Sequence, residues 1–244
     1  YSINSKKYLK EYQGIRYCDV SNGVGITDFT KYIAKLNDLW GIDTIVGTRI
    51  TNYLDFKYDY IKHQIATNYY ILKNNEGWAL LNTSDKTISS KISDKIDVVY
   101  NLSGGLYMLN VVTTDNIKYS YRLFDKDGNK TLELTDISYL DVFEKYIIYV
   151  SNNIVYVVDF NGKSLIANPI KLYLKYTRSE SGIQAFYANE INNNLVISTP
   201  KTNTATHYTD EYYYNLDDFS LIKTRLNVKE TLQWKKCLSI DGYF

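Results

Sequence analysis

The chain has 244 residues and a mass of 28.4 kDa, enough for one large all-β domain or for two smaller domains. Its 28 Lys and Arg residues against 27 Asp and Glu residues give a formal net charge of +1. No segment concentrates the basic residues, so the composition argues against a nucleic-acid partner. A hydrophobic share of 45% supports a buried core and excludes bulk disorder.

Tyrosine is the unusual residue, with 26 Tyr against 8 Phe. Because Tyr suits pleated, half-buried surfaces, this bias favours β-strands. The abundance of Tyr, Asn, Lys and Ile also suggests an AT-rich gene, as in low-GC bacteria. No run of about 18 apolar residues is present, so no membrane span is expected. The polar start Tyr1-Ser2-Ile3-Asn4 is interpreted as that of a chain from which an N-terminal signal or anchor was removed.

Along the chain, the hydrophobic pattern predicts strands almost throughout. The best helical candidate covers residues 29–39, where the spacing of the apolar side chains fits a helix only weakly. Six short β-branched or aromatic runs, separated by polar turn clusters, are predicted strands: 69–72, 78–81, 106–112, 119–124, 146–150 and 154–158.

Asparagine recurs in turns between these apolar runs. The turns lie at Asn37, Asn75, Asn116, Asn152 and Asn193, and their spacing is nearly constant. Because Asn tolerates the positive φ of tight turns, each is predicted to be a hairpin tip. A second series of turns follows them, at 43–47, 83–86, 126–128 and 160–162. Two turn series with a shared period of about 40 residues are typical of four-stranded propeller blades.

The predicted fold is therefore all-β, a β-propeller-like array of about five to six small antiparallel sheets. We expect these sheets to form a single domain over residues 1–244. The last unit is longer than the others, and its segment Thr199–Thr209 is polar and contains Pro200. This composition predicts an exposed, mobile loop that lies close to any ligand site.

Two Trp-containing segments resemble the bacterial WG repeat. They are Leu39-Trp40-Gly41-Ile42-Asp43 and Gly77-Trp78-Ala79-Leu80-Leu81-Asn82, and Tyr58-Asp59-Tyr60 is similar to the end of a WG unit. Ala79 stands where the family has glycine, and the third to fifth units carry no Trp. The resemblance implies a bacterial surface or envelope protein, in a family of which many members have no known activity. Trp40 and Trp78 are expected in the core.

Catalytic motifs are sparse in this sequence. The only histidines are His63 and His207, and neither lies in a nucleophile elbow. Asp125, Asp127 and Asn129 have the alternating oxygen ligands of a calcium loop, but the Gly and the closing Glu are misplaced. A hairpin turn is the preferred interpretation there. The sequence thus predicts no metal and no cofactor.

The best candidate for a ligand site is the Tyr-rich segment after the expected loop, with His207, Tyr208, Tyr212 and Tyr214 as its residues. Exposed Tyr offers a stacking surface with a hydrogen-bonding tip, as glycan and protein sites require. The alternative is a structural strand with Tyr213 on the opposite face from its neighbours. The paired carboxylates Asp210-Glu211 and Asp217-Asp218 fit either glycosidase chemistry or solvated turns.

Cys18 and Cys237 could form one disulfide or remain free thiols, and a closed ring would bring them close together. The leading functional hypothesis is a non-enzymatic surface or envelope domain of a low-GC bacterium that recognises a protein or glycan ligand. The alternative is a carbohydrate-active hydrolase on a propeller scaffold, which depends on fold analogy alone.

Overall fold

The computed structural model describes residues 14–17, 31–46, 49–64, 68–113, 119–176, 185–204 and 206–231. Every regular element in these ranges is a β-strand, so the predicted all-β class is confirmed. None of the described residues belongs to a helix that is long and apolar enough to cross a membrane.

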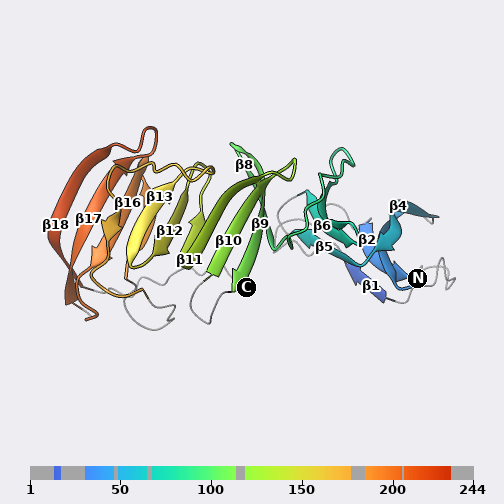
Figure 1. Cartoon of the computed structure of the whole chain (residues 1–244), viewed down its shortest axis with the longest axis horizontal. Coiled ribbons are helices and arrows are strands. Elements are labelled where there is room, and N and C mark those ends of the chain that lie inside the picture. The colour runs from blue at the N-terminus through green and yellow to red at the C-terminus, as the bar shows by residue number, and fades with distance from the viewer. Residues whose placement is uncertain are drawn as a thin grey trace. The chain divides into compact units, whose positions relative to one another are not determined.

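The strands form four sheets, and in each sheet the strands follow one another in sequence order (Figure 1). The first sheet contains β1 Gly14–Tyr17, β2 Lys31–Leu36, β3 Leu39–Val46 and β4 Arg49–Tyr58. The second contains β5 Tyr60–Gln64, β6 Tyr69–Asn74 and β7 Gly77–Asn82. The third contains β8 Val98–Leu102, β9 Gly105–Thr113, β10 Tyr119–Asp125, β11 Lys130–Val142, β12 Ile147–Ser151, β13 Ile154–Val158 and β14 Ile170–Lys171. The fourth contains β15 Tyr187–Ile191, β16 Asn194–Pro200, β17 Thr206–Asn215 and β18 Leu221–Thr231.

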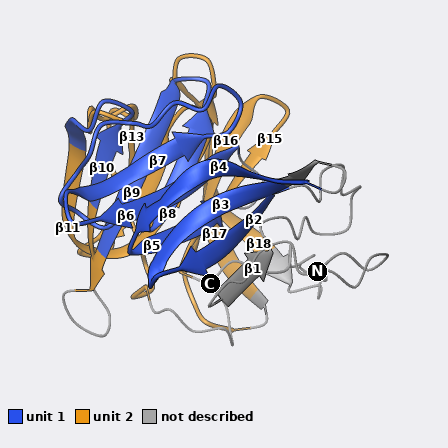
Figure 2. Cartoon of the chain, turned by 90° about the vertical axis from the view of Figure 1, so that its right-hand side faces the viewer, with its two compact units in different colours: residues 1–111, 122–131 blue, residues 112–121, 132–244 orange. Residues whose placement is uncertain are grey.

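The chain divides into two compact units, coloured separately in Figure 2. The first unit comprises 1–111 and 122–131, and the second comprises 112–121 and 132–244. The boundary passes through β9, β10 and β11 of the seven-stranded sheet. A single domain over the whole chain stays a prediction.

Four of the five Asn turns are hairpin tips, as predicted. Asn37, Asn152 and Asn193 have φ values of 51°, 50° and 59°, and in each turn the neighbouring central residue also has a positive φ. This is the backbone of a type I′ turn, which matches the twist of the two strands. Asn75 lies in the β6–β7 turn, whereas Asn116 lies outside the described residues.

The position of Asn193 differs from the expectation of equivalent places in successive sheets. Asn37 and Asn75 each join the second and third strands of a sheet, but Asn193 joins the first and second strands of its own. The next hairpin of that sheet joins β16 to β17, and 201–204 is the described part of its connection. The last unit is therefore longer because the first and second strands of its sheet are joined by a tight hairpin of their own. The turn of this hairpin gives the same Asn signal as the turns of the other sheets.

Three of the four turns of the second series are present, at 83–86, 126–128 and 160–162, and an aspartate carboxylate caps each of them. The turn expected at 43–47 is wrong, because residues 43–46 pair with β4 as part of strand β3. In the turn Asp125–Asn129 the Asp125 carboxylate accepts the backbone N–H groups of Asp127 and Asn129, each at 2.9 Å. In Asp159–Lys163 the Asp159 carboxylate accepts the equivalent two groups at the same distances. A Gly with φ of +83° lies in both turns, as a type I turn with a bulge requires.

The hairpins β2–β3 and β6–β7 of the first unit have the same strand register. Trp40 lies opposite Lys35, and Trp78 lies opposite Lys73. Every other described pair of the second hairpin matches a pair of the first at the same offset in residue number. Both Trp side chains are half-buried at the margin of apolar clusters rather than inside the core, which corrects the expectation.

The glycine after the first Trp has a local steric reason. A Cβ on Gly41 would lie 2.8 Å from both the backbone oxygen of Leu54 and the ring of Phe56. A bulge in the β3–β4 pairing brings that strand close to Gly41. Ala79, at the equivalent place in β7, is buried, and the described part of its sheet has no fourth strand. The alanine therefore follows from a different neighbour, not from a different hairpin.

Residues 31–36, inside the only candidate helix, form β2. Tyr32, Ile33 and Ala34 are consecutive and all buried, because this inner strand is covered on both faces. A strand buried on both faces lacks the alternation that distinguishes strand from helix. The six strands predicted from apolar runs are found as β6, β7, β9, β10, β12 and β13.

Each unit has its own apolar core. In the first unit one cluster lies around Ile42, Ile61 and Leu72, and a second lies around Leu80 and Met108. In the second unit a single larger cluster joins residues of the β12–β13 hairpin with residues of β16 and β17. The second core leaves Tyr212 and Phe219 only partly buried at its margin, and both residues border a cavity of this unit.

Candidate functional site

The segment expected to be a loop forms strand for most of its length. Thr199 and Pro200 end β16, Thr206 begins β17, and Thr199 and Thr209 are fully buried. Lys201–Thr204 is the described part of the connection. The expected exposed loop over Thr199–Thr209 is therefore wrong. The polar side chains are tolerated because the strands satisfy the backbone, and Thr199 donates its hydroxyl to the backbone oxygen of Asp210.

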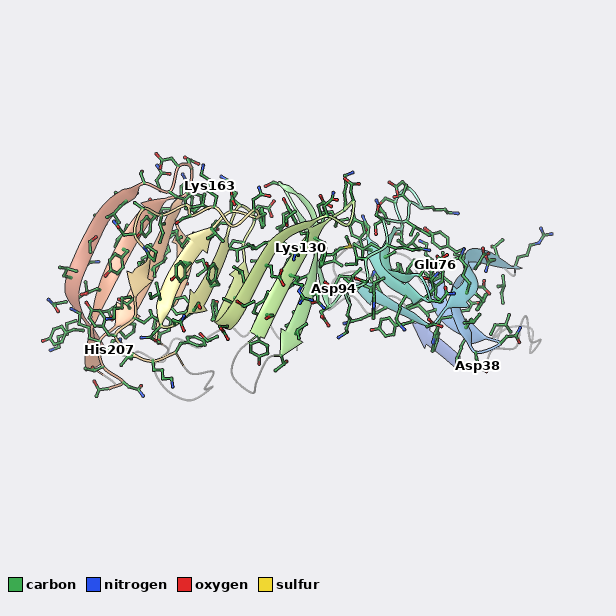
Figure 3. All side chains as sticks on the ribbon, viewed as in Figure 1. Asp38, Glu76, Asp94, Lys130, Lys163 and His207 are labelled. Atoms are coloured by element: carbon green, nitrogen blue, oxygen red, sulfur yellow. The ribbon has the colours of Figure 1, made fainter. Side chains whose placement is uncertain are left out.

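The four predicted ligand residues lie on β17 but do not form one group. His207, labelled in Figure 3, is buried, and its Nδ1 lies 3.1 Å from the backbone oxygen of Thr204. Tyr208 is 52% exposed. Neither residue lines the large cavity of the second unit, whereas Tyr212 and Tyr214 both do. Strand alternation places His207 on the opposite face from the three tyrosines, and Tyr208 lies nearer the start of β17 than the two tyrosines that line the cavity.

The cavity that Tyr212 and Tyr214 border has a volume of about 840 Å³. One wall is the segment around β14, and the other is the β17–β18 hairpin. The lining residues are Leu165, Ala167, Asn168, Pro169, Ile170, Lys171, Leu172, Tyr173, Tyr212, Tyr214, Asp218, Phe219, Ser220, Leu221 and Thr224. The walls are thus mostly aromatic and aliphatic, with hydroxyl and amide groups among them.

The phenols in this cavity are shielded from ionisation. Burial raises the pKa of Tyr212, and the nearby Asp210 carboxylate raises it further. Burial also raises the pKa of Tyr214, with a smaller effect from Tyr212. Neutral phenols can both donate and accept hydrogen bonds while their rings offer stacking surface.

Asp210 lies beside the cavity and anchors one of its walls. Its carboxylate accepts hydrogen bonds from the Tyr173 hydroxyl at 2.6 Å, from Lys201 Nζ at 2.9 Å and from the Asn227 backbone N–H at 2.9 Å. Burial alone would raise the pKa of Asp210, but these three donors together lower it below its ordinary value. The group therefore stays ionised.

The adjacent Glu211 points to the opposite face of the sheet. Its carboxylate accepts hydrogen bonds from Arg225 at 3.0 Å and from the Tyr213 hydroxyl at 2.8 Å. Tyr213 is thus on the opposite face from Tyr212 and Tyr214, as the structural alternative predicted. The Asp210-Glu211 pair therefore supplies one carboxylate to each face.

The other carboxylate pair is a turn, as the solvated alternative predicted. In Asp217-Asp218, the exposed Asp218 accepts hydrogen bonds from the hydroxyl and the backbone N–H of Ser220, and both lower its pKa. Asp217 lies 3.0 Å from the Asn193 side-chain amide. A glycosidase acid instead needs a raised pKa.

The remaining candidates are structural. The Asp125 carboxylate caps its own turn, so the hairpin interpretation of the calcium-like motif is confirmed. The His63 ring on β5 lies 4.8 Å from the Tyr70 ring. Within the described ranges no group of three or more His, Cys, Asp or Glu side chains could hold a metal ion. Cys18 and Cys237 lie outside those ranges.

Sequence reasoning misses half of the site. Tyr173 and the segment 165–172 lie far from β17 in the sequence, and no motif marks them. Lys201 lies in the polar segment Thr199–Thr209, but no motif pairs it with Asp210. The sequence marks Asp210 only as one of a carboxylate pair. Pro169 and Asn168 are the one local signal of an irregular segment, but they do not indicate what the segment contacts.

Comparisons with known proteins give likeness in structure alone. No family model matches the chain, and no curated protein does. Hsv2 from Kluyveromyces lactis is 15% identical, with 83% of this chain and 71% of that chain covered at a TM-score of 0.37. The AfRom2 CNH domain is 9% identical, with 88% of this chain and 86% of that chain covered at a TM-score of 0.38. The Nup159 N-terminal domain is 9% identical, with 79% of this chain and 57% of that chain covered at a TM-score of 0.33. These neighbours are β-propeller-like proteins.

Proposed function

We propose that the chain is a non-enzymatic recognition domain that binds a glycan or protein ligand in the cavity of its second unit. The observation that carries the proposal is the cavity of about 840 Å³ itself, walled by Tyr173, Tyr212, Tyr214 and Phe219. A volume of this size is typical of small-ligand sites, which bring an apolar surface together with a few polar groups.

The chemistry of the lining favours an uncharged, amphipathic ligand. Aromatic rings offer flat surfaces to the C–H faces of a sugar or to apolar side chains. Asn168, Ser220 and Thr224 offer neutral donors and acceptors. One lysine, Lys171, and one aspartate, Asp218, balance each other in charge. A glycan satisfies both kinds of surface at once, and an extended peptide is the second ligand class.

The alternative of a carbohydrate-active hydrolase has less support at this cavity. Such enzymes need a carboxylic acid that stays protonated near neutral pH. The pKa values of Asp218 on the rim and of Asp210 beside the wall are both lowered. These groups therefore act as ionised acceptors rather than as general acids.

The decisive test is binding to an array that contains neutral oligosaccharides and extended peptides. Tyr212→Ala should weaken binding by about tenfold or more, because it removes a ring from the cavity. Tyr208→Ala is the matched control, since Tyr208 is an exposed tyrosine of the same strand that does not line the cavity. Equal losses in both variants would exclude the cavity as the site. Release of reducing ends from a bound oligosaccharide would favour the hydrolase instead.

We also propose a location on the surface or envelope of a low-GC bacterium and a relationship to WG repeats. The two Trp hairpins support the relationship, because they match pair for pair at one constant offset in residue number. Fractionation of the source cells, with protease treatment of intact cells, tests the location. Persistence of the protein in protease-treated intact cells would contradict it.

A further inference from the structure

Tyr173 is an exposed residue of the cavity wall whose hydroxyl group is held by a hydrogen bond. It follows β14 in a segment without regular strand structure, and its side chain is 52% exposed. Its hydroxyl nevertheless donates a 2.6 Å hydrogen bond to Asp210, and Lys201 Nζ lies 4.9 Å from its ring centroid. An exposed side chain normally samples several rotamers, so these contacts restrict Tyr173 where packing does not.

Asp210 is itself held rigidly. Its side chain is 2% exposed, and Lys201 Nζ and the Asn227 backbone N–H donate to the same carboxylate oxygen. The second contact exists because the β17–β18 pairing bulges at Asp210, and Asn227 adopts a positive φ of 55° opposite the bulge. Lys201 also donates to the Asn227 side-chain oxygen at 2.8 Å. The carboxylate is therefore fixed by the sheet and by the connection before β17.

We propose that Asp210 and Lys201 are positioning residues that hold Tyr173 in place as one wall of the ligand cavity. The proposal deepens the proposed function and depends on it, because it assigns a role to a wall of the same cavity. Neither Asp210 nor Lys201 lines the cavity, so their effect on a ligand passes through Tyr173. Loss of the carboxylate would free the phenol and the segment that carries it.

The first experiment needs no ligand. Tyrosine labelled at the ζ carbon reports each phenol by NMR, and Tyr173→Phe assigns the Tyr173 signal. The hydrogen bond to Asp210 is the main reason for the raised pKa of Tyr173. Asp210→Asn should therefore move the Tyr173 titration to lower pH. It should also speed amide exchange over residues 170–175 by about tenfold.

Glu211→Gln is the matched control, because it neutralises the neighbouring buried carboxylate on the other face. It should disturb Tyr213 and leave the Tyr173 signal unchanged. Tyr173→Phe keeps the buried carboxylate with its other two donors, and it should reproduce the faster exchange even if Asp210→Asn folds poorly. An unchanged Tyr173 titration in Asp210→Asn, or an exchange rate unchanged in both variants, would overturn the proposal.

The second experiment connects the wall to binding. With the array oligosaccharide or peptide that the wild-type chain binds, Asp210→Asn and Tyr173→Phe should each weaken affinity by about tenfold. The double variant should be no weaker than either single variant, since both remove one contact. Additive losses would contradict positioning through Tyr173. Absence of any wild-type ligand would instead count against the proposed function, while the NMR result still decides whether the contact holds the wall.

Discussion

Two turns, one in each unit, have the same hydrogen bonds and backbone conformation but lie in different surroundings. In Asn82–Thr87 and Asn215–Ser220 the first residue donates its backbone N–H to the last residue's oxygen, at 2.9 and 3.0 Å. The fifth residue, Lys86 or Phe219, has a positive φ of 61° or 56°. An Asn and an Asp side chain cap the backbone in both turns.

The segments after the two turns both return antiparallel to the preceding strand, but they pair with it differently. After the first turn the chain returns along β7, with bridges from Leu81 to Ile88 and from Trp78 to Ile92. After the second turn β18 runs as an edge strand, and the turn residues Asp218–Ser220 line the cavity. The hydrogen-bonding side chains thus specify the turn, whereas contacts made elsewhere decide whether it closes a packed sheet or borders the cavity.

The largest effect on stability is expected in the two Trp hairpins, which have the same register but pack against different neighbours. Gly41→Ala should lower the free energy of unfolding by about 2–4 kcal/mol, because the new methyl would meet the Leu54 backbone oxygen. Ala79→Gly, at the equivalent position, should cost only about 1 kcal/mol. Urea denaturation measures both. Equal losses would mean that the neighbouring strands do not distinguish the hairpins.

A smaller effect is expected at the fifth residue of the two turns. Phe219→Gly should cost about 2 kcal/mol, because the Phe219 ring contacts Tyr146 at 5.3 Å and lines the cavity. Lys86→Gly should change stability by less than about 1 kcal/mol, since relief of the positive φ offsets loss of the Lys86–Tyr53 contact. Thermal unfolding of the two variants gives the comparison. A larger loss for Lys86→Gly would contradict it.

Acid should weaken the contacts that the Asp210 carboxylate makes with its donors. Its folded pKa is lowered, so its stabilisation is complete above the unfolded pKa and is lost as pH falls through the folded pKa. The groups that face it are Tyr173, Lys201 and Tyr212, and the two tyrosines remain neutral throughout this range. Asp210→Asn should therefore flatten the acid limb of the stability curve, measured by denaturation between pH 7 and the acid transition. An unchanged acid limb would show that the contact does not stabilise the fold.

The smallest effect should be equal in the two turns. Asn82→Ala removes the acceptor for the Ser84 backbone N–H, and Asn215→Ala removes the acceptor for that of Asp217. Each change should cost about 1 kcal/mol, because each turn loses one partly solvated hydrogen bond. Differential scanning calorimetry can resolve the two losses. Clearly unequal values would mean that the turns are less alike than their hydrogen bonds.

The sequence by itself determined the strands and the turns of this protein. Apolar runs predicted β6, β7, β9, β10, β12 and β13, and the Asn signals predicted four described hairpin tips, because both depend on neighbours within a few residues. Where burial on both faces removed the alternation, at Tyr32–Ala34, the pattern was ambiguous. Asn193 showed that a turn signal identifies a hairpin without stating which hairpin of the sheet it is.

Only the tertiary structure decided the site. Tyr212 and Tyr214 were predicted, but Tyr208, which strand alternation places on the same face, lies nearer the start of β17 and does not line the cavity. Tyr173 comes from another part of the chain, and its hydrogen bond to Asp210 spans 37 residues. Such contacts depend on how core packing brings segments together, and no local pattern in the sequence encodes them. The same reason explains why Thr199–Thr209, polar in sequence, is largely strand, with its ends buried in the second unit.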